Sequence, residues 1–153
     1  MEFHEVYMRA ALMEAEKARK KGECPVGAVI VRNNAIIGRG HNLRERKQSV
    51  LMHAELEAIR KASHVRESWR LQDCDLYVTL EPCPMCAGAI IQSRIRRVYF
   101  GAYDKKAGAA GSVCDLFVPG LFNHTVDVTG GIMQEACAEI LSKFFRQLRT
   151  KEQ

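Results

Sequence analysis

The sequence has no long hydrophobic run. Its longest uncharged apolar stretches are about six residues long, as in Val26–Val31, whereas a membrane-spanning helix needs about 20. The opening residues, Met1–Glu5, have no basic segment followed by an apolar block, which is the pattern of a secretory signal. We therefore expect no membrane span and no export signal, and we predict a cytoplasmic protein.

Internal repeats, low-complexity segments and linkers rich in proline, serine or glycine are also absent from the sequence. With 47% hydrophobic and 27% charged residues, the composition excludes a disordered chain. A chain of 153 residues is long enough to bury a substantial core, and it suits one domain better than two. We therefore predict a single domain over residues 1–153.

Acidic residues are fewer than basic ones. Lys and Arg number 23 and Asp and Glu number 18, so the net charge is +5, which is compatible with a polyanionic partner but does not demonstrate one. Without an export signal, cysteines at uneven spacing indicate free thiols or metal ligands rather than disulfides. The chain has six of them: Cys24, Cys74, Cys83, Cys86, Cys114 and Cys137.

Hydrophobic periodicity predicts four helices and five strands. The predicted helices cover 8–18, 52–63, 85–93 and 133–148, and the predicted strands cover 26–31, 35–38, 75–79, 97–100 and, with a weaker pattern, 125–128. Residues 41–50 and 107–111 are interpreted as loops, and the Asn33-Asn34 pair as a hairpin turn.

This order of elements predicts an α/β fold. Strand–helix–strand units imply parallel neighbouring strands, and the first hairpin implies an antiparallel pair. One mixed sheet of about five strands with helices on both faces, a three-layer α/β/α sandwich, satisfies these requirements. The last helix carries a clear apolar stripe that suits a core or a subunit interface, with Phe144 on the stripe and Phe145 one step off it.

Two short segments carry the residue types that bind a metal. His53-Ala54-Glu55 opens the second predicted helix, and Cys83-Pro84-Met85-Cys86 opens the third. Two cysteines three residues apart at a helix start can direct their sulfurs at one ion. A histidine from another helix start would complete a set of three zinc ligands. Helix N-termini also favour the thiolate form that binds metal.

Three ligands leave one coordination position of zinc for water. Zinc lowers the pKa of bound water to about 7, which makes hydroxide available near neutral pH. Glu55 lies close enough in sequence to His53 to take the proton from that water and pass it to a leaving amine. The alternatives are a redox dithiol, which leaves His53 and Glu55 unexplained, and a closed structural site that borrows a fourth ligand from His41, His64 or Cys74.

Beyond these two segments, much of the chain resembles the zinc nucleobase deaminases, and among them the bacterial tRNA-specific adenosine deaminases. The segments that carry the resemblance are 24–29, 40–42, 79–90, 100–104, 108–112, 122–124 and 144–146, with His53-Ala54-Glu55. The resemblance implies a cytidine deaminase-like fold, a single zinc-dependent deaminase domain over 1–153 and a homodimer with one zinc ion per subunit. It also implies conversion of adenosine to inosine at the wobble position of the anticodon of an arginine tRNA.

The resemblance implies a role for individual residues. His53, Cys83 and Cys86 match the zinc ligands, and Glu55 matches the proton shuttle. The matches to substrate-contacting residues are Asn42 at the target nucleotide, Val26 and Pro82 as pocket walls, the Ala54 backbone at the base edge, Asp104 at a neighbouring ribose and Phe145 against the anticodon loop. Val50-Leu51-Met52, Cys24 and Tyr103 depart from the residues usual in the family.

Physical reasoning is consistent with an RNA substrate. An anticodon loop presents unstacked bases that can enter a pocket, whereas a base inside a stem cannot reach a buried zinc ion. Basic residues that can contact phosphates follow the matched positions or lie on the last helix: Arg44, Arg46, Lys47, Lys105, Lys106, Lys143, Arg146, Arg149 and Lys151.

Two other functions remain open on the sequence alone. A deaminase of a free nucleobase, nucleoside or nucleotide would use the same zinc ligands and the same Glu55. A zinc-stabilised RNA-binding module without catalysis would have a fourth protein ligand and a dispensable Glu55. The other four cysteines, Cys24, Cys74, Cys114 and Cys137, are expected to pack in the core.

Overall fold

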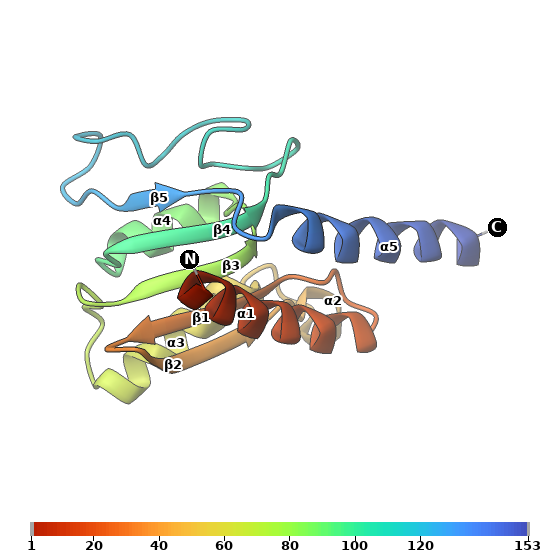
Figure 1. The fold of residues 1–153 in the computed structure, drawn as a ribbon, viewed down its shortest axis with the longest axis horizontal. Coiled ribbons are helices and arrows are strands. Elements are labelled where there is room, and N and C mark those ends of the chain that lie inside the picture. The colour runs from red at the N-terminus through yellow and green to blue at the C-terminus, as the bar shows by residue number, and fades with distance from the viewer. Residues whose placement is uncertain (1, 153) are drawn as a thin grey trace.

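The chain folds around one five-stranded sheet in a computed structural model that describes residues 2–152 (Figure 1). The helices are α1 (Glu2–Lys20), α2 (Arg44–Lys47), α3 (Ala54–Arg66), α4 (Pro84–Gln92) and α5 (Gln134–Glu152). The strands are β1 (Gly27–Arg32), β2 (Ala35–His41), β3 (Asp75–Leu80), β4 (Arg97–Ala102) and β5 (Asp127–Thr129).

The sheet is mixed, as predicted, with the strand order β2-β1-β3-β4-β5. β1 pairs antiparallel with both β2 and β3, whereas β3, β4 and β5 are parallel. One expectation was wrong: β2 and β3, which α3 connects, are not neighbours, because β1 lies between them. The β3–α4–β4 unit does place its two parallel strands side by side.

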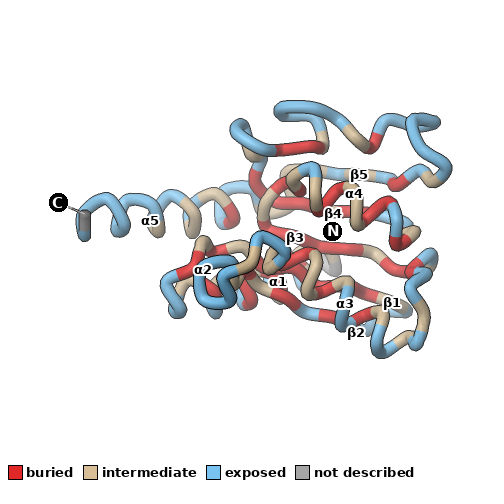
Figure 2. Tube along the Cα trace, turned by 180° about the vertical axis from the view of Figure 1, so that it is seen from behind, coloured by how far each residue is buried: buried red, intermediate tan, exposed pale blue. Residues whose placement is uncertain are grey.

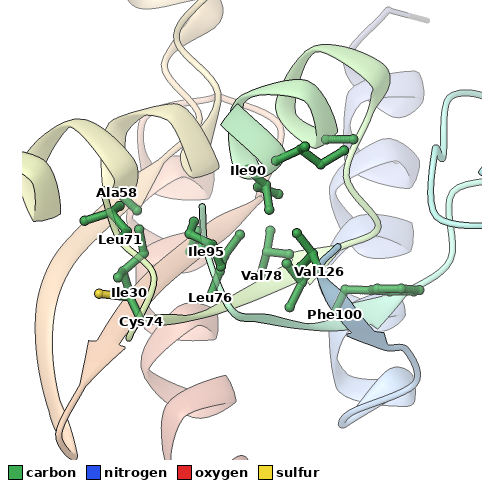
Figure 3. Close-up of a cluster of buried hydrophobic side chains, with 14 of the residues drawn as sticks. Ile30, Ala58, Leu71, Cys74, Leu76, Val78, Ile90, Ile95, Phe100 and Val126 are labelled. Atoms are coloured by element: carbon green, nitrogen blue, oxygen red, sulfur yellow. The ribbon is translucent and has the colours of Figure 1, made fainter. Parts of the chain in front are cut away.

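Helices cover both faces of the sheet, which confirms the three-layer α/β/α arrangement. α3 and α4 pack on one face and α1 and α5 on the other. Figure 3 shows the core beneath α3 and α4, where Ile30, Leu76 and Val78 from the strands contact Ile90 and Ala58 from the helices. Burial of each large aliphatic side chain there stabilises the fold by about 1.5–3 kcal/mol.

Close packing of α3 on β2 holds the start of α3 in place. A Cβ atom at Gly40 would lie 2.3 Å from the Ala54 carbonyl oxygen, and one at Gly38 would lie 2.3 Å from that of Ala58. Only glycine allows this approach of helix and strand backbones. The first turn of α3, which contains Ala54 and Glu55, is therefore held against the end of β2.

Several boundaries differ from the sequence prediction. Residues 41–50 are not entirely a loop, because Arg44–Lys47 forms the short helix α2. The second long helix begins at Ala54 rather than at residue 52, and β5 covers Asp127–Thr129 rather than 125–128, because its pairing with β4 starts opposite Arg97.

Burial follows the layers, as Figure 2 shows, with the strands mostly buried and the far end of α5 mostly exposed. Cys74 and Cys137 are buried as expected, but Cys114 is exposed and therefore does not pack in the core. Phe144, on the apolar stripe of α5, is only half-buried. Within residues 2–152, none of the helices is long and apolar enough to cross a membrane.

Candidate metal centre and its cavity

Three metal-binding side chains meet where α3 and α4 begin. His53 is the N-cap residue of α3, Cys83 is the N-cap residue of α4, and Cys86 lies in the first turn of α4. Both N-cap residues have extended backbone conformations, and neither side chain caps its own helix. Their donor atoms are therefore not used by the helix ends.

The distances between the donor atoms fit zinc. His53 Nδ1 lies 3.7 Å from Cys83 Sγ and 3.4 Å from Cys86 Sγ, and the three donor atoms all lie within 4.8 Å of one another. Tetrahedral zinc with ordinary Zn–N and Zn–S bonds separates a nitrogen and a sulfur ligand by about 3.6 Å. The histidine and the two cysteines are thus spaced as one ion requires.

No fourth protein ligand joins this group among residues 2–152. The residues considered as fourth ligands lie elsewhere: His41 contacts Glu14 and Lys21, and Cys74 contacts Arg66 and Asp73. His64 lies in the last turn of α3, at the opposite end of that helix from His53. A site with three protein ligands is typical of catalytic rather than structural zinc.

The surroundings of the Cys83 thiol favour metal binding. A hydrogen bond from Cys86, and another with His53, lower the pKa of the Cys83 thiol to about 4. The hydrogen bond with Cys83, together with burial, raises the pKa of the Cys86 thiol. The N-terminus of α4 adds its positive dipole end to this site.

Glu55 lies beside the metal-binding group on the first turn of α3. Its side chain is 4% exposed, and burial raises the pKa of its carboxyl group to about 7. It lines the same cavity as His53 and Cys83. The predicted proton shuttle and the predicted zinc ligands are therefore together in the structure.

A cavity of about 490 Å³ opens from this group to the surface. Most of the predicted substrate-contacting residues line it: Val26, Asn42, Ala54, Asp104 and Phe145. Pro82, which was expected to form a pocket wall, is buried and does not line the cavity. Its carbonyl oxygen accepts a hydrogen bond from the Ala109 amide. Cys24 lines the cavity too, rather than packing in the core as expected.

Asn42 and Asp104 are each held by local hydrogen bonds. Asn42 Nδ2 donates to the Cys24 carbonyl oxygen at 3.3 Å, and its Oδ1 accepts from the Arg44 amide at 3.2 Å. Asp104 Oδ1 accepts from the amides of Lys106 and Ala107 at 3.0 and 3.1 Å. Asn42 is therefore fixed through both polar atoms of its amide, and Asp104 through one carboxylate oxygen.

Glu81 is a buried residue of this region that sequence reasoning missed. It is 2% exposed, and its carboxyl oxygens accept hydrogen bonds from the amides of Asp104, Ala110 and Ser112 at 2.9–3.1 Å. It also accepts a hydrogen bond from the Ser112 hydroxyl. Glu81 therefore holds the segment 104–112 beside the metal-binding group. The sequence feature that could have indicated a buried role for Glu81 is its position directly after a buried strand and before Pro82.

Comparisons with known proteins agree with this geometry. Curated relatives include a tRNA-specific adenosine deaminase of Bacillus subtilis, 50% identical over 97% of this chain and 92% of the relative. Another, from Haemophilus influenzae, is 47% identical over 99% of this chain and 88% of the relative.

Among solved structures, one from a study of A-to-I editing by tRNA:A34 deaminases at the wobble position of transfer RNA superposes with a TM-score of 0.85. It is 43% identical over 89% of this chain and 99% of that chain. A guanine deaminase from Nitrosomonas europaea, 23% identical over 92% of this chain and 83% of its own, shares the fold with a TM-score of 0.77. The zinc-binding region of the cytidine and deoxycytidylate deaminases matches residues 1–102, more than half of the chain. The chain therefore belongs to the cytidine and deoxycytidylate deaminase family.

Proposed function

We propose that this chain is a tRNA adenosine deaminase that converts adenosine to inosine at the wobble position, 34, of the anticodon of an arginine tRNA. Membership of the deaminase family makes it a zinc-dependent hydrolytic deaminase. The observation that carries the proposal is the three-ligand metal group with Glu55 beside it in the cavity. The chain that holds this group is 50% identical to a tRNA-specific adenosine deaminase over nearly its whole length.

In this proposal His53, Cys83 and Cys86 hold the zinc ion, which when bound supplies Lewis-acid activation of water near neutral pH. Glu55 takes a proton from the attacking water and delivers it to the amine that leaves the purine ring. Water is consumed and ammonia is released, so the amino group of adenine is replaced by the oxygen of inosine. The burial of Glu55 supports this role, because a buried carboxyl group keeps the proton for the amine rather than losing it to solvent.

The cavity receives the adenine base after it leaves the stack of the anticodon loop. Val26 supplies an apolar wall, and Asn42 contacts the target nucleotide. The Ala54 amide binds the edge of the base, since Ala54 is in the first turn of α3, where amide groups have no partner within the helix.

The remainder of the loop lies across the cavity mouth. Asp104 contacts the ribose of a neighbouring nucleotide, and Phe145, which is 42% exposed, packs against the loop. Basic side chains on the segments that line the cavity position the phosphates, and salt weakens these contacts. These are Arg44, Arg46 and Lys47 after Asn42, Lys105 and Lys106 after Asp104, and Lys143, Arg146, Arg149 and Lys151 on α5.

The proposal includes the assembly and the cellular location. Residues 1–153 form one deaminase domain, and two copies form a homodimer in the cytoplasm with one zinc ion per subunit. Exposed apolar side chains in two loop segments are available for a subunit interface: Val50 and Leu51, and Val113, Val118, Leu121 and Phe122. Light scattering should give twice the chain mass of 17.3 kDa, and a mass of one chain would contradict the dimer.

The substrate is tested with purified protein and an anticodon stem-loop of an arginine tRNA that carries adenosine at the wobble position. Free adenosine, cytidine and guanine are incubated separately, and products are separated by chromatography after nuclease digestion. We expect inosine from the stem-loop and no product from the free compounds. A matched stem-loop with the same adenosine paired inside the stem should not react, because a paired base cannot enter the cavity.

The other possible functions give different results. Turnover of a free compound alone would assign the chain to the deaminases of small molecules. Bound zinc and bound RNA without any product would assign it to RNA-binding modules without catalysis. If stem-loops of other tRNAs gave inosine at the same rate, the proposed specificity for an arginine tRNA would be wrong, and the proposed deamination of adenosine would still stand.

A further inference from the structure

We propose that Glu23 is a positioning residue that fixes one side of the cavity mouth for the RNA. It lies in the connection between α1 and β1, and its side chain is 2% exposed. It lines the cavity, but it is neither a predicted metal ligand nor a predicted substrate contact. A buried carboxyl group needs hydrogen-bond donors, and the groups that donate to Glu23 indicate its role.

Both donors come from the short helix α2. The Glu23 carboxyl oxygens accept hydrogen bonds from the amides of Glu45 and Arg46 at 3.1 and 2.6 Å. The first amides of a helix have no partner within the helix, and they are usually capped by the residue just before it. Here that residue is Leu43, whose side chain cannot cap, so Glu23 supplies the acceptors from 20 or so residues away.

A second set of bonds connects the same two segments. The Asn42 amide donates to the Val26 carbonyl oxygen at 3.1 Å, and Asn42 Nδ2 donates to the Cys24 carbonyl oxygen. The loop before β1 and the segment after β2 are therefore joined at Asn42 as well as at α2. Figures 1 and 2 both show α2 beside the end of α1, where this connection is made.

The segment that Glu23 holds carries substrate-contacting groups. Asn42 precedes α2, and Arg44 and Glu45 from α2 line the cavity. A four-residue helix has too few internal hydrogen bonds to be stable by itself. Without Glu23, α2 would sample other conformations, and the RNA would have to order it on binding, which weakens binding. This inference rests on the proposed function.

The test is the isosteric variant Glu23→Gln. A carboxamide keeps one acceptor oxygen, but it places an NH2 group opposite one of the two backbone amides, so one hydrogen bond is lost. We expect KM for the stem-loop to rise about tenfold, with kcat and zinc content nearly unchanged, because one charge-assisted hydrogen bond is of that magnitude. Hydrogen exchange at the amides of residues 45 and 46 should become faster in the protein without RNA.

Two comparisons separate positioning from a general loss of stability. Ile95→Val removes one methylene group from the core at a residue that does not line the cavity, and it should lower Tm without changing KM. In a protein that already carries Asn42→Ala, adding Glu23→Gln should raise KM less than about twofold. Asn42 accepts a hydrogen bond from the first amide of the same helix that Glu23 holds, and changes within one hydrogen-bond network are not additive.

The outcomes are distinct. Faster exchange at residues 45 and 46 with an unchanged KM would overturn the positioning role, as would additive effects of Glu23→Gln and Asn42→Ala. Unchanged exchange would overturn the structural part of the proposal. Failure of the proposed function would appear differently, as an absence of inosine with the unaltered protein.

Discussion

The inner and outer ends of the cavity are built differently. At the inner end, Cys86 and Glu55 are almost completely buried, and the first turns of α3 and α4 fix their positions. At the outer end, Phe145 and Leu148 are 42% and 41% exposed on α5. Figure 1 shows the last turns of α5 extending beyond the edge of the sheet.

This difference separates chemistry from recognition. Proton transfer and metal binding need atoms held within a few tenths of an ångström, and packing against the sheet provides that rigidity. Contacts with a large flexible substrate can form on exposed side chains that become buried on binding. Substitutions at the inner end should therefore abolish activity, and substitutions at the outer end should mainly weaken binding.

Cys86→Ser at the inner end should have the largest effect. It removes one of three ligands, and metal binding contributes directly to folding. We expect zinc content to fall below about one tenth of an ion per chain, Tm to fall and activity to be lost. Metal analysis measures the zinc content, thermal unfolding measures Tm, and the stem-loop assay measures activity. Cys114→Ser, at an exposed thiol, should keep zinc and stability. Full zinc content in Cys86→Ser would contradict the ligand assignment.

Glu55→Ala should separate catalysis from the other properties of the inner end. Loss of a positioned proton-transfer group lowers kcat by about 10²- to 10⁴-fold. Zinc content and RNA affinity should remain, because Glu55 is neither a ligand nor at the cavity mouth. The matched control is Glu57→Ala, two residues along α3, where the carboxylate pairs with Arg60 outside the cavity. Retained turnover in Glu55→Ala would remove Glu55 from the mechanism.

The inner end is the part of the site that the sequence predicted well. The ligands occur in short segments whose spacing is set by a helix start, so Cys83 and Cys86 are close in space because they are close in sequence. The strands and long helices were predicted for the same reason, since their periodicity is local. The placement of His53 beside the cysteines depends on the fold, and it was expected only because a histidine at another predicted helix start would complete a zinc site.

The outer end and its supports were predicted less well because they depend on distant contacts. The short helix α2 was interpreted as a loop, since its cap is Glu23 rather than a neighbouring residue. The acceptor role of Glu81 depends on a segment about 30 residues away. Phe144 was assigned to an apolar stripe that suits a core or a subunit interface, but the residue is half-buried and lines the cavity.

Gly40→Ala tests whether the packing of α3 on β2 gives the inner end its rigidity. The new Cβ would meet the Ala54 carbonyl oxygen and push the first turn of α3 away from the strand. We expect a loss of about 1–3 kcal/mol in the free energy of unfolding and weaker zinc binding. Denaturant unfolding and metal competition measure these effects. Arg39→Ala, an exposed neighbour on β2, should change stability by less than about 0.5 kcal/mol.

Phe145→Ala at the outer end should have the smallest effect and should give the opposite pattern. Stacking of a base on an aromatic ring contributes at least about 1 kcal/mol, so KM for the stem-loop should rise about fivefold or more. The value of kcat, the zinc content and Tm should stay close to those of the unaltered protein, because the ring is exposed and is not one of the metal-binding side chains. Val65→Ala, at an exposed apolar residue on α3 outside the cavity, is the control. A fall in kcat of the size expected for Glu55→Ala would mean that Phe145 takes part in ordering the catalytic groups, and the separation between the two ends would then be wrong.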